Sequence, residues 1–440
     1  MGKLKMNKMA LKILIVMIMS ISIYGENFNP SSESINGESN ISTAQEEIQQ
    51  PIEVQSVRSI LSGYDPLEHT KGQVRAGYIN FSEDGIPNTT AYALGGHFHL
   101  QTQRWNGLMV GAEVYTVLNL ASNQNDSEQN SDFFDANGKS FILLSQAYLD
   151  GKWDNTEIKL GRQSLDTPHA DSDDIRMMPN YFEVYRITNT DVDDLTLSAG
   201  FIDKMAGWEN GVDSSDFVDV GETLGVGQHT DGIYYVTATY EGIRDLSLSL
   251  WYYNYHDIAN VIYAEAGYSY QFSKDISLIL GLQFDGTQET GTELLGKQDA
   301  QTYGISLESN FAQIGVTVLA AYNQDNGDTG AMGLSLGGGP FFTSMEDQTL
   351  DAMETPGSAW IVGAGYDLGK VGVDNLIFGV AYGSFEAEDS SLYESRETNV
   401  VLEYNLNDKI TASAAYASVD FRVNGVADYD QFRLIANYNF

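Results

Sequence analysis

The last ten residues, Gln431–Phe440, read QFRLIANYNF. Successive side chains of a β-strand point to opposite faces, so this stretch has one apolar face and one polar face. The apolar face carries Phe432, Leu434, Ala436, Tyr438 and Phe440, and the polar face carries Gln431, Arg433, Asn437 and Asn439. Such a strand fits the wall of a closed barrel that has lipid outside and a wet lumen inside. A soluble strand can show the same alternation, so the argument depends on its repetition.

The same alternation recurs along the rest of the chain. Val400, Leu402 and Tyr404, for example, alternate with Glu403 and Asn405. We count eighteen segments of this kind, at 72–81, 91–102, 107–119, 140–151, 155–163, 181–189, 194–203, 231–241, 245–255, 260–272, 275–286, 300–309, 313–323, 358–368, 373–384, 395–406, 409–421 and 430–440. One face of each segment suits lipid and the other suits water.

The connections between these segments alternate in length. Short turns fall at 104–106, 152–154, 242–244, 273–274, 369–372 and 407–408. Long connections fall at 120–139, 164–180, 204–230, 287–299, 324–357 and 385–394. Short periplasmic turns and long extracellular loops are typical of outer-membrane barrels. The sequence therefore predicts an all-β fold, a transmembrane antiparallel β-barrel of about eighteen strands whose two termini lie on the side of the short turns.

Composition excludes several classes of function. The 440 residues contain no cysteine, which rules out disulfides, thiolate metal sites and cysteine nucleophiles. The formal net charge of −38 argues against nucleic-acid binding, because neutralising phosphates requires lysine and arginine. The 26 tyrosines, 43 glycines and only 8 prolines fit many strands with tight turns and aromatic belts.

The chain divides into three parts. Residues 1–25 have a lysine-rich start followed by a short apolar core, which predicts a secretory signal peptide. Residues 26–71 are a polar extension, and residues 72–440 are the barrel domain. These features predict export to the outer membrane of a Gram-negative bacterium.

Charge is segregated along the chain. The long loops are acidic, and the loop at 324–357 carries six carboxylates and no base, whereas several short turns carry lysine or arginine. Acidic loops can simply be solvated. Alternatively, they form an electrostatic vestibule that concentrates cations at the mouth of the pore.

The segment 160–183, LGRQSLDTPHADSDDIRMMPNYFE, differs from the rest of the chain. Its pattern Gly-Arg-Gln, Thr-Pro, Asp-Asp with Arg176, then Pro179 and Phe182-Glu183 resembles the OprD-like family of outer-membrane porins. In that family an eighteen-stranded barrel has its third external loop folded inward, with acidic loop residues facing a basic wall. The resemblance implies that the third long loop, 164–180, narrows the pore. It also implies constriction residues, which are Arg162, Asp171, Asp173, Asp174 and Arg176.

Two further arginines fit a basic wall. Arg75 alternates with apolar Val74 and Ala76, and Arg433 lies on the polar face of the last strand. Both are predicted to line the lumen. Opposed charges across a narrow neck create a transverse field that orients zwitterions. A simpler role for Asp173 and Arg176 is an ion pair that only tethers the loop, and both roles are compatible.

No catalytic or metal site is expected, and neither is a cofactor. None of the six histidines lies in a serine-containing signature, which argues against an outer-membrane barrel hydrolase. His97 and His99 share a strand face and lack an identifiable third ligand, so two polar lumen residues are favoured over a metal site.

A surface or secreted β-rich adhesin without a channel is the other alternative. It would bury Leu278, Leu280 and Leu282 in a dry core between two sheets, whereas a barrel turns them towards lipid. The apolar outward faces favour a porin, a water-filled channel for passive diffusion of ions and small hydrophilic solutes. Its expected partners are membrane lipid and the barrel-assembly machinery, which would act on the C-terminal strand ending in Phe440. The sequence leaves monomer and oligomer open.

Overall fold

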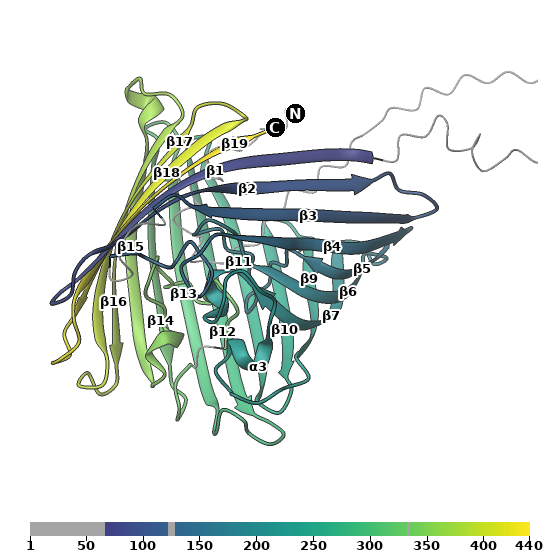
Figure 1. The fold of residues 1–440 in the computed structure, drawn as a ribbon. Coiled ribbons are helices and arrows are strands. Elements are labelled where there is room, and N and C mark those ends of the chain that lie inside the picture. Colours follow the sequence, from purple (N-terminus) through teal and green to yellow (C-terminus); the bar gives the residue numbers. More distant parts are fainter. Residues whose placement is uncertain (1–66, 122–127, 332–333) are drawn as a thin grey trace, which may run out of the picture.

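Long antiparallel strands, each hydrogen-bonded to its neighbours along the chain, close into a barrel (Figure 1). The computed structural model describes residues 67–121, 128–331 and 334–440. The barrel closes where β19 pairs with β1, from Gln73 opposite Asn439 to Glu83 opposite Tyr429. Closure leaves no strand edge unpaired, which a sheet in hydrocarbon requires.

The strands are β1 (Leu67–Glu83), β2 (Thr89–Thr102), β3 (Leu108–Asn119), β4 (Phe141–Trp153), β5 (Thr156–Gln163), β6 (Tyr181–Asn189), β7 (Leu195–Ala206), β8 (Val218–Asp219), β9 (Ile233–Ile243), β10 (Leu246–Tyr255), β11 (Ala259–Ser273), β12 (Ile276–Glu289), β13 (Asp299–Phe311), β14 (Val316–Asp325), β15 (Gly357–Asp367), β16 (Leu376–Ala387), β17 (Glu394–Asn405), β18 (Ile410–Phe421) and β19 (Tyr429–Asn439). The short helices are η1 (Trp208–Asn210), α3 (Val220–Thr223), η2 (Asp351–Met353) and η3 (Leu368–Val371). The two-residue β8 belongs to a loop and pairs only with β7. The other strands of the described chain form the wall, which has eighteen strands as predicted.

The two faces of the wall differ as the alternation requires. On β12, Leu280 and Leu282 are 37% and 50% exposed on the outside, whereas Gln283 and Asp285 on the inside are 5% and 2% exposed. The predicted lipid-facing leucines therefore do not lie in a dry core between two sheets. The adhesin built as a β-sandwich is wrong for this chain.

The strand ends depart from the predicted ones by a few residues. Strand β1 begins at Leu67, five residues before the expected start at Gly72, because its pairing with β2 continues towards the periplasmic end. The connection at 256–258 is short although it lies on the side of the long loops. The predicted signal peptide 1–25 and the extension 26–71 up to residue 66 lie outside the described residues, so both stay predictions.

Loops fill much of the barrel interior. The connections at 164–180 and 326–356 turn inward, and each contributes buried apolar side chains that pack against the inner face of the wall. Leu165 and Ala170 join one such cluster with Tyr253, and Phe341 and Phe342 join another with Phe385. No helix in the described part of the chain is both long and apolar enough to cross a bilayer.

Candidate functional site

The two inward loops meet each other inside the barrel. Ala170 and Leu336 form a parallel bridge, in which the Leu336 amide donates to the His169 carbonyl at 2.8 Å and the Asp171 amide donates to the Leu336 carbonyl at 3.2 Å. Two loops that are far apart in sequence therefore share one short ladder. The loops form a joint plug against the wall.

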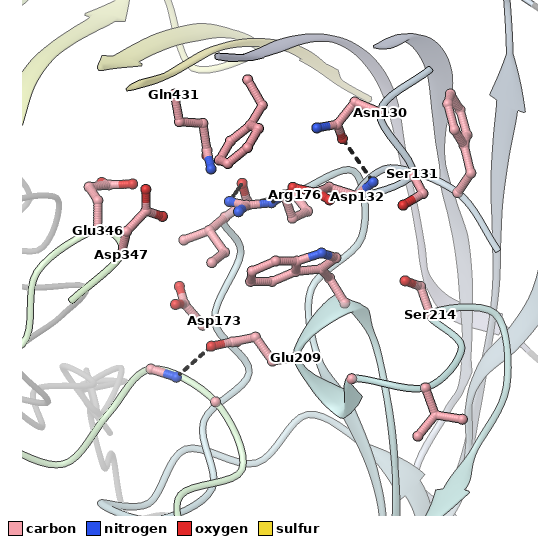
Figure 2. Close-up of a pocket in the computed structure, with 18 of the residues that line it drawn as sticks. Asn130, Ser131, Asp132, Asp173, Arg176, Glu209, Ser214, Glu346, Asp347 and Gln431 are labelled. Carbon is pink, nitrogen blue, oxygen red and sulfur yellow. Dashed lines mark hydrogen bonds and ion pairs between the residues drawn. The ribbon is translucent and has the colours of Figure 1, made fainter. Parts of the chain in front are cut away.

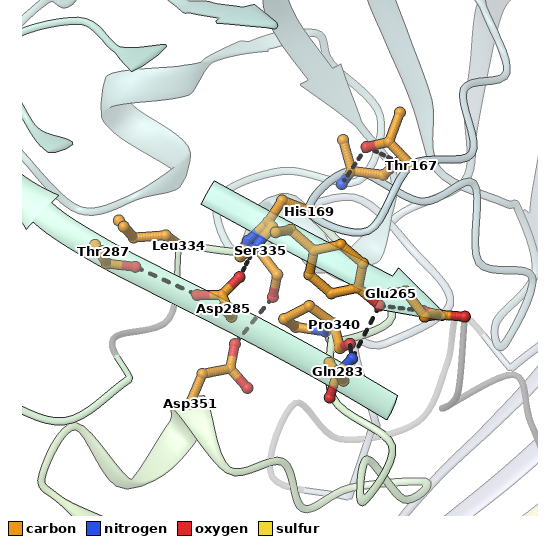
Figure 3. A network of polar contacts seen from close by, with 12 residues as sticks. Thr167, His169, Glu265, Gln283, Asp285, Thr287, Leu334, Ser335, Pro340 and Asp351 are labelled. Carbon is orange, nitrogen blue, oxygen red and sulfur yellow. Dashed lines mark hydrogen bonds and ion pairs between the residues drawn. The ribbon is translucent and has the colours of Figure 1, made fainter. Parts of the chain in front are cut away.

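Strands β10 and β12 hold this joint plug through polar contacts, and Figure 3 shows those of Gln283 and Asp285 on β12. The Nε2 atom of His169 lies 2.6 Å from Oδ2 of Asp285, and both residues are buried. From the other loop, the Pro340 carbonyl accepts a hydrogen bond of 2.6 Å from Nε2 of Gln283. The hydroxyl of Tyr255 donates to the Leu334 carbonyl, also at 2.6 Å. The wall thus satisfies polar groups of both loops that burial would otherwise leave unpaired.

The two predicted wall arginines each contact a carboxylate from one of the inward loops. Arg75 on β1 binds both carboxylate oxygens of Asp174 and also donates to the Asn437 side chain at 2.8 Å. On β19, Nη2 of Arg433 lies 2.7 Å from Oε2 of Glu346. Both arginines are almost fully buried. Asp174 comes from loop 164–180 and Glu346 from loop 326–356, so each loop is tied to the wall by an ion pair.

Arg176 lies between the loops on the face of an aromatic ring (Figure 2). Its guanidinium carbon lies 3.9 Å from the ring centroid of Trp208, and its Nε atom lies 3.6 Å from Oδ2 of Asp132. Burial lowers the pKa of Arg176, and the nearby Arg433 lowers it further. The predicted pairing of Arg176 with Asp173 is not present, since Asp132 is the carboxylate that forms an ion pair with it.

Three carboxylates crowd together where loops 164–180 and 207–232 meet. Burial raises the pKa of Asp171 to about 8, and the charges of Asp166 and Glu209 add to this shift. Burial also raises the pKa of Asp173 and of Glu209, and the three side chains repel one another when ionised. Glu209 accepts a hydrogen bond from the Gly338 amide at 3.0 Å, which connects this cluster to loop 326–356.

Asp173 and Glu209 of this cluster border a cavity of about 860 Å³ at the external end of the lumen. Its lining comes from four loops and the ends of β1 and β19, among them Phe81 and Tyr429. Among the described residues, the charged side chains of the lining are Asp132, Asp135, Asp173, Arg176, Glu209, Asp213, Glu346 and Asp347. Carboxylates thus far outnumber the single guanidinium at this cavity. Burial raises the pKa of Asp347 to about 6.

Arg162 does not join the cluster of loop carboxylates. Its Nε atom lies 3.5 Å from Oε2 of Glu183, and its guanidinium carbon lies 4.2 Å from the ring centroid of Phe217. The Tyr185 hydroxyl also donates to Glu183. Because Tyr185 is exposed on the outer face, the pair of Arg162 and Glu183 lies on that side of the wall.

The two histidines of β2 lie beside a carboxylate that the sequence did not identify. His99 Nδ1 is 3.4 Å and His97 Nε2 is 3.9 Å from Oε2 of Glu113, whose other oxygen accepts from the Tyr181 hydroxyl at 2.6 Å. Within the described ranges, no three histidine, aspartate or glutamate side chains are placed to hold a metal ion. The contacts with the buried Glu113 place both imidazoles on the inner face of the wall.

Sequence reasoning missed the second inward loop and the residues it brings. The loop at 326–356 was expected to be an acidic external loop, yet it buries Leu336, Phe341 and Phe342 inside the barrel. The signal was available, since a solvated loop has no physical reason to carry so many large apolar side chains. No sequence pattern of this kind indicated that Asp132 pairs with Arg176 or that Glu209 binds the Gly338 amide.

Comparison with known proteins agrees with this architecture. The family described as outer membrane porin, OprD family, matches residues 101–440. Pseudomonas aeruginosa OccK9 (OpdG) is 21% identical, with a TM-score of 0.73 over 84% of this chain and 97% of that chain. P. aeruginosa OpdK, solved with vanillate, is 20% identical, with a TM-score of 0.69 over 85% and 99%. Acinetobacter baumannii OccAB3 is 16% identical, with a TM-score of 0.71 over 84% and 98%.

These similarities cover 84% or more of this chain and show a shared fold. A comparison with curated protein sequences gives no match. The family match covers most of the chain, including the segment with the Gly-Arg-Gln and Asp-Asp motifs. An enzymatic role, which the sequence argued against, does not belong to this family. The chain belongs to the OprD family of outer membrane porins, non-enzymatic channels that take up small molecules across the outer membrane of Gram-negative bacteria.

Proposed function

We propose that the chain is a passive channel for ions and small hydrophilic solutes, and that loops 164–180 and 326–356 together narrow its pore. Support comes from the ladder between Ala170 and Leu336 and from the buried contact of His169 with Asp285. These contacts hold both loops against the inner wall. Transport through such a pore follows the concentration gradient and needs no cofactor.

The proposed neck includes Asp171, Asp173, Asp174 and Arg176 of loop 164–180, with Arg75 and Arg433 in the adjoining wall. The ion pair between Arg75 and Asp174 supports this assignment, because it fixes the acidic end of the loop to β1. Arg162 is left out of the proposed neck, since it pairs with Glu183 and packs on Phe217.

We further propose that the external vestibule favours cations. The observation that carries this proposal is the cavity of about 860 Å³, whose charged lining is almost entirely carboxylate. A recess lined by one sign of charge concentrates counter-ions and speeds their entry. Cationic solutes should therefore reach the neck more readily than anionic ones.

Reversal potentials in planar bilayers test the proposal. Purified protein should insert as channels, and a KCl gradient should give a reversal potential of the sign expected for K⁺ preference. The preference should weaken as salt concentration rises, because salt screens charges at the mouth. Clear Cl⁻ preference would refute the cation vestibule, and absence of channel activity would refute the porin function itself.

Assembly through the C-terminal strand is a separate proposal. The amides and carbonyls of Phe440 and Gly72 bond to each other at 2.9 Å, so the last residue takes part in closing the barrel. Recognition by the barrel-assembly machinery would precede this closure. Deleting Phe440 should lower the amount of folded protein in outer membranes, measured by heat-modifiable migration on gels. Chemical cross-linking in membranes tests whether the barrels associate into oligomers.

A further inference from the structure

Two arginines mark the seam at which the barrel closes. In the pairing of β1 with β19, Arg75 lies opposite Asn437 and Arg433 lies opposite Ile79. The two arginines are thus four residues apart along the seam, or about 13 Å at 3.3 Å per residue. Both side chains point inward, since the neighbouring Val74, Phe432 and Leu434 are exposed on the outer face. The seam therefore carries two separate basic positions inside the barrel.

A loop carboxylate covers each of these arginines. Arg75 makes four hydrogen bonds, two to the carboxylate of Asp174, one to the Asn437 side chain and one to the Arg176 carbonyl at 3.0 Å. A guanidinium has five N–H donors, so a single donor is left for any other acceptor. A carboxylate arriving from solution has no bidentate position on Arg75 unless it displaces Asp174.

The acid is the more exposed partner of each pair. The Asp174 side chain is 34% exposed and the Arg75 side chain 3%, and for Glu346 and Arg433 the values are 15% and 8%. A solute passing this stretch of wall meets carboxylate oxygens, although the strands themselves supply guanidinium groups. The loops therefore hide the positive charge of the seam.

We propose that Asp174 and Glu346 determine the charge selectivity of the channel by capping Arg75 and Arg433. With the caps in place, the seam is electrically close to neutral. Without the caps, two guanidinium groups face the solute and attract anions such as small carboxylates. This inference rests on the proposed function of a conducting pore and specifies which residues discriminate between solutes.

The isosteric substitutions D174N and E346Q remove one cap charge each while keeping the side-chain shape. Each should lower the permeability ratio of K⁺ over acetate several-fold in bilayer measurements, because each leaves the charge of an arginine uncompensated. The effects should add in the double variant, since the two positions are well separated. D389N is the matched control, because Asp389 is an exposed external carboxylate whose hydrogen bonds come from Ser391. D389N should change the permeability ratio of K⁺ over acetate little.

Capping and a simple loss of negative charge give different results when the arginine is also removed. If Asp174 acts by capping, D174N should make the acetate current saturate at a lower acetate concentration in the wild-type background and have little effect on this saturation in the R75Q background, because bidentate binding of acetate needs the guanidinium. An equal shift in both backgrounds would overturn the proposal. E346Q in the wild-type and R433Q backgrounds repeats the test at the second position. If D174N lowers the folded fraction on heat-modifiable gels, the E346Q comparison alone decides the proposal. If the wild-type protein forms no channel, the proposed function is refuted. If it conducts and the shifts are equal with and without the arginine, only the capping is refuted.

Discussion

His169 and Asp285 form a buried contact of 2.6 Å that joins the tip of loop 164–180 to strand β12 across the barrel interior. Three tyrosine rings surround the imidazole, with centroid distances of 5.2 Å to Tyr253, 6.2 Å to Tyr263 and 6.5 Å to Tyr255. The next residue, Ala170, forms the bridge to loop 326–356. Both inward loops therefore meet at this contact, in addition to their separate ion pairs with Arg75 and Arg433.

Replacing His169 by alanine should loosen both loops without unfolding the barrel. Removing one partner of a buried polar pair costs about 3–5 kcal/mol, because the remaining group stays buried and uncompensated. The strand ladders that hold the wall are untouched. We expect H169A to show frequent conductance fluctuations in single-channel recordings. Its migration on heat-modifiable gels should match that of the wild type, because the barrel stays folded.

The control for this prediction is H229A. His229 also lies near a carboxylate, with Nδ1 3.0 Å from Oδ2 of Asp219, but its side chain is 72% exposed. Exposed pairs contribute roughly 0–1 kcal/mol, so H229A should leave the recordings unchanged. If H169A channels show no more conductance fluctuations than wild-type channels, the imidazole does not anchor the loop.

Deleting residues 165–175 should raise the single-channel conductance. The deletion removes His169, Ala170 and Asp174, and with them the contacts to β12, to loop 326–356 and to Arg75. Less protein then fills the lumen, and a wider pore carries more current. Conductance in 1 M KCl is the measurement, and a value equal to that of the wild type would remove loop 164–180 from the constriction.

Replacing Gly96 by alanine should destabilise the barrel. Gly96 has a φ of 132°, and an added Cβ would lie 1.9 Å from the backbone oxygen of Gln73 on β1. The backbone strain alone costs about 1–3 kcal/mol, and the clash with a backbone atom adds to it. We expect G96A to unfold at a lower temperature in the gel-shift assay. G267A is the control, because the corresponding Cβ would have no heavy atom within 4 Å.

Raising the pH should weaken the docking of loop 164–180. The pKa of Asp171 is raised to about 8 in the folded protein, above its ordinary value of 3.8, by burial and by the charges of Asp166 and Glu209. Between these two values the folded state holds more protons than the unfolded state, so stability falls as pH rises from about 4 to about 8. Open-channel noise should therefore increase between pH 5 and pH 9.

The substitution D171N removes this titrating group and should reduce the pH response. It should not abolish the response, since Asp173 and Glu209 are shifted in the same direction. D154N, in an exposed periplasmic turn, should leave the response as in the wild type. An identical pH response in D171N and the wild type would contradict the role of Asp171.

Alternation along single strands was enough to predict the wall. All eighteen predicted segments overlap barrel strands, and 181–189 coincides with β6 although its pattern is irregular. The face that each strand turns to lipid depends on neighbouring residues only, so it can be read locally. The positions of Arg75 and Arg433 on inner faces followed from the same alternation.

Contacts between distant residues could not be read in this way. Arg75 and Asp174 are 99 positions apart, and Arg433 and Glu346 are 87 apart. Many carboxylates in the acidic loops were possible partners, and loop conformation alone selects among them. Arg162 is an example of a contact that the motif did not predict. The motif indicated a position near the loop carboxylates, whereas in the structure Arg162 pairs with Glu183.

The sequence by itself determined a closed wall with an apolar outside, because that property repeats every two residues. Only the tertiary structure decided that loop 326–356 also enters the barrel and that acids of both inward loops cover the arginines of the seam. The physical reason is that a buried charge must find an opposite charge, and the fold of the whole chain decides which one lies within reach.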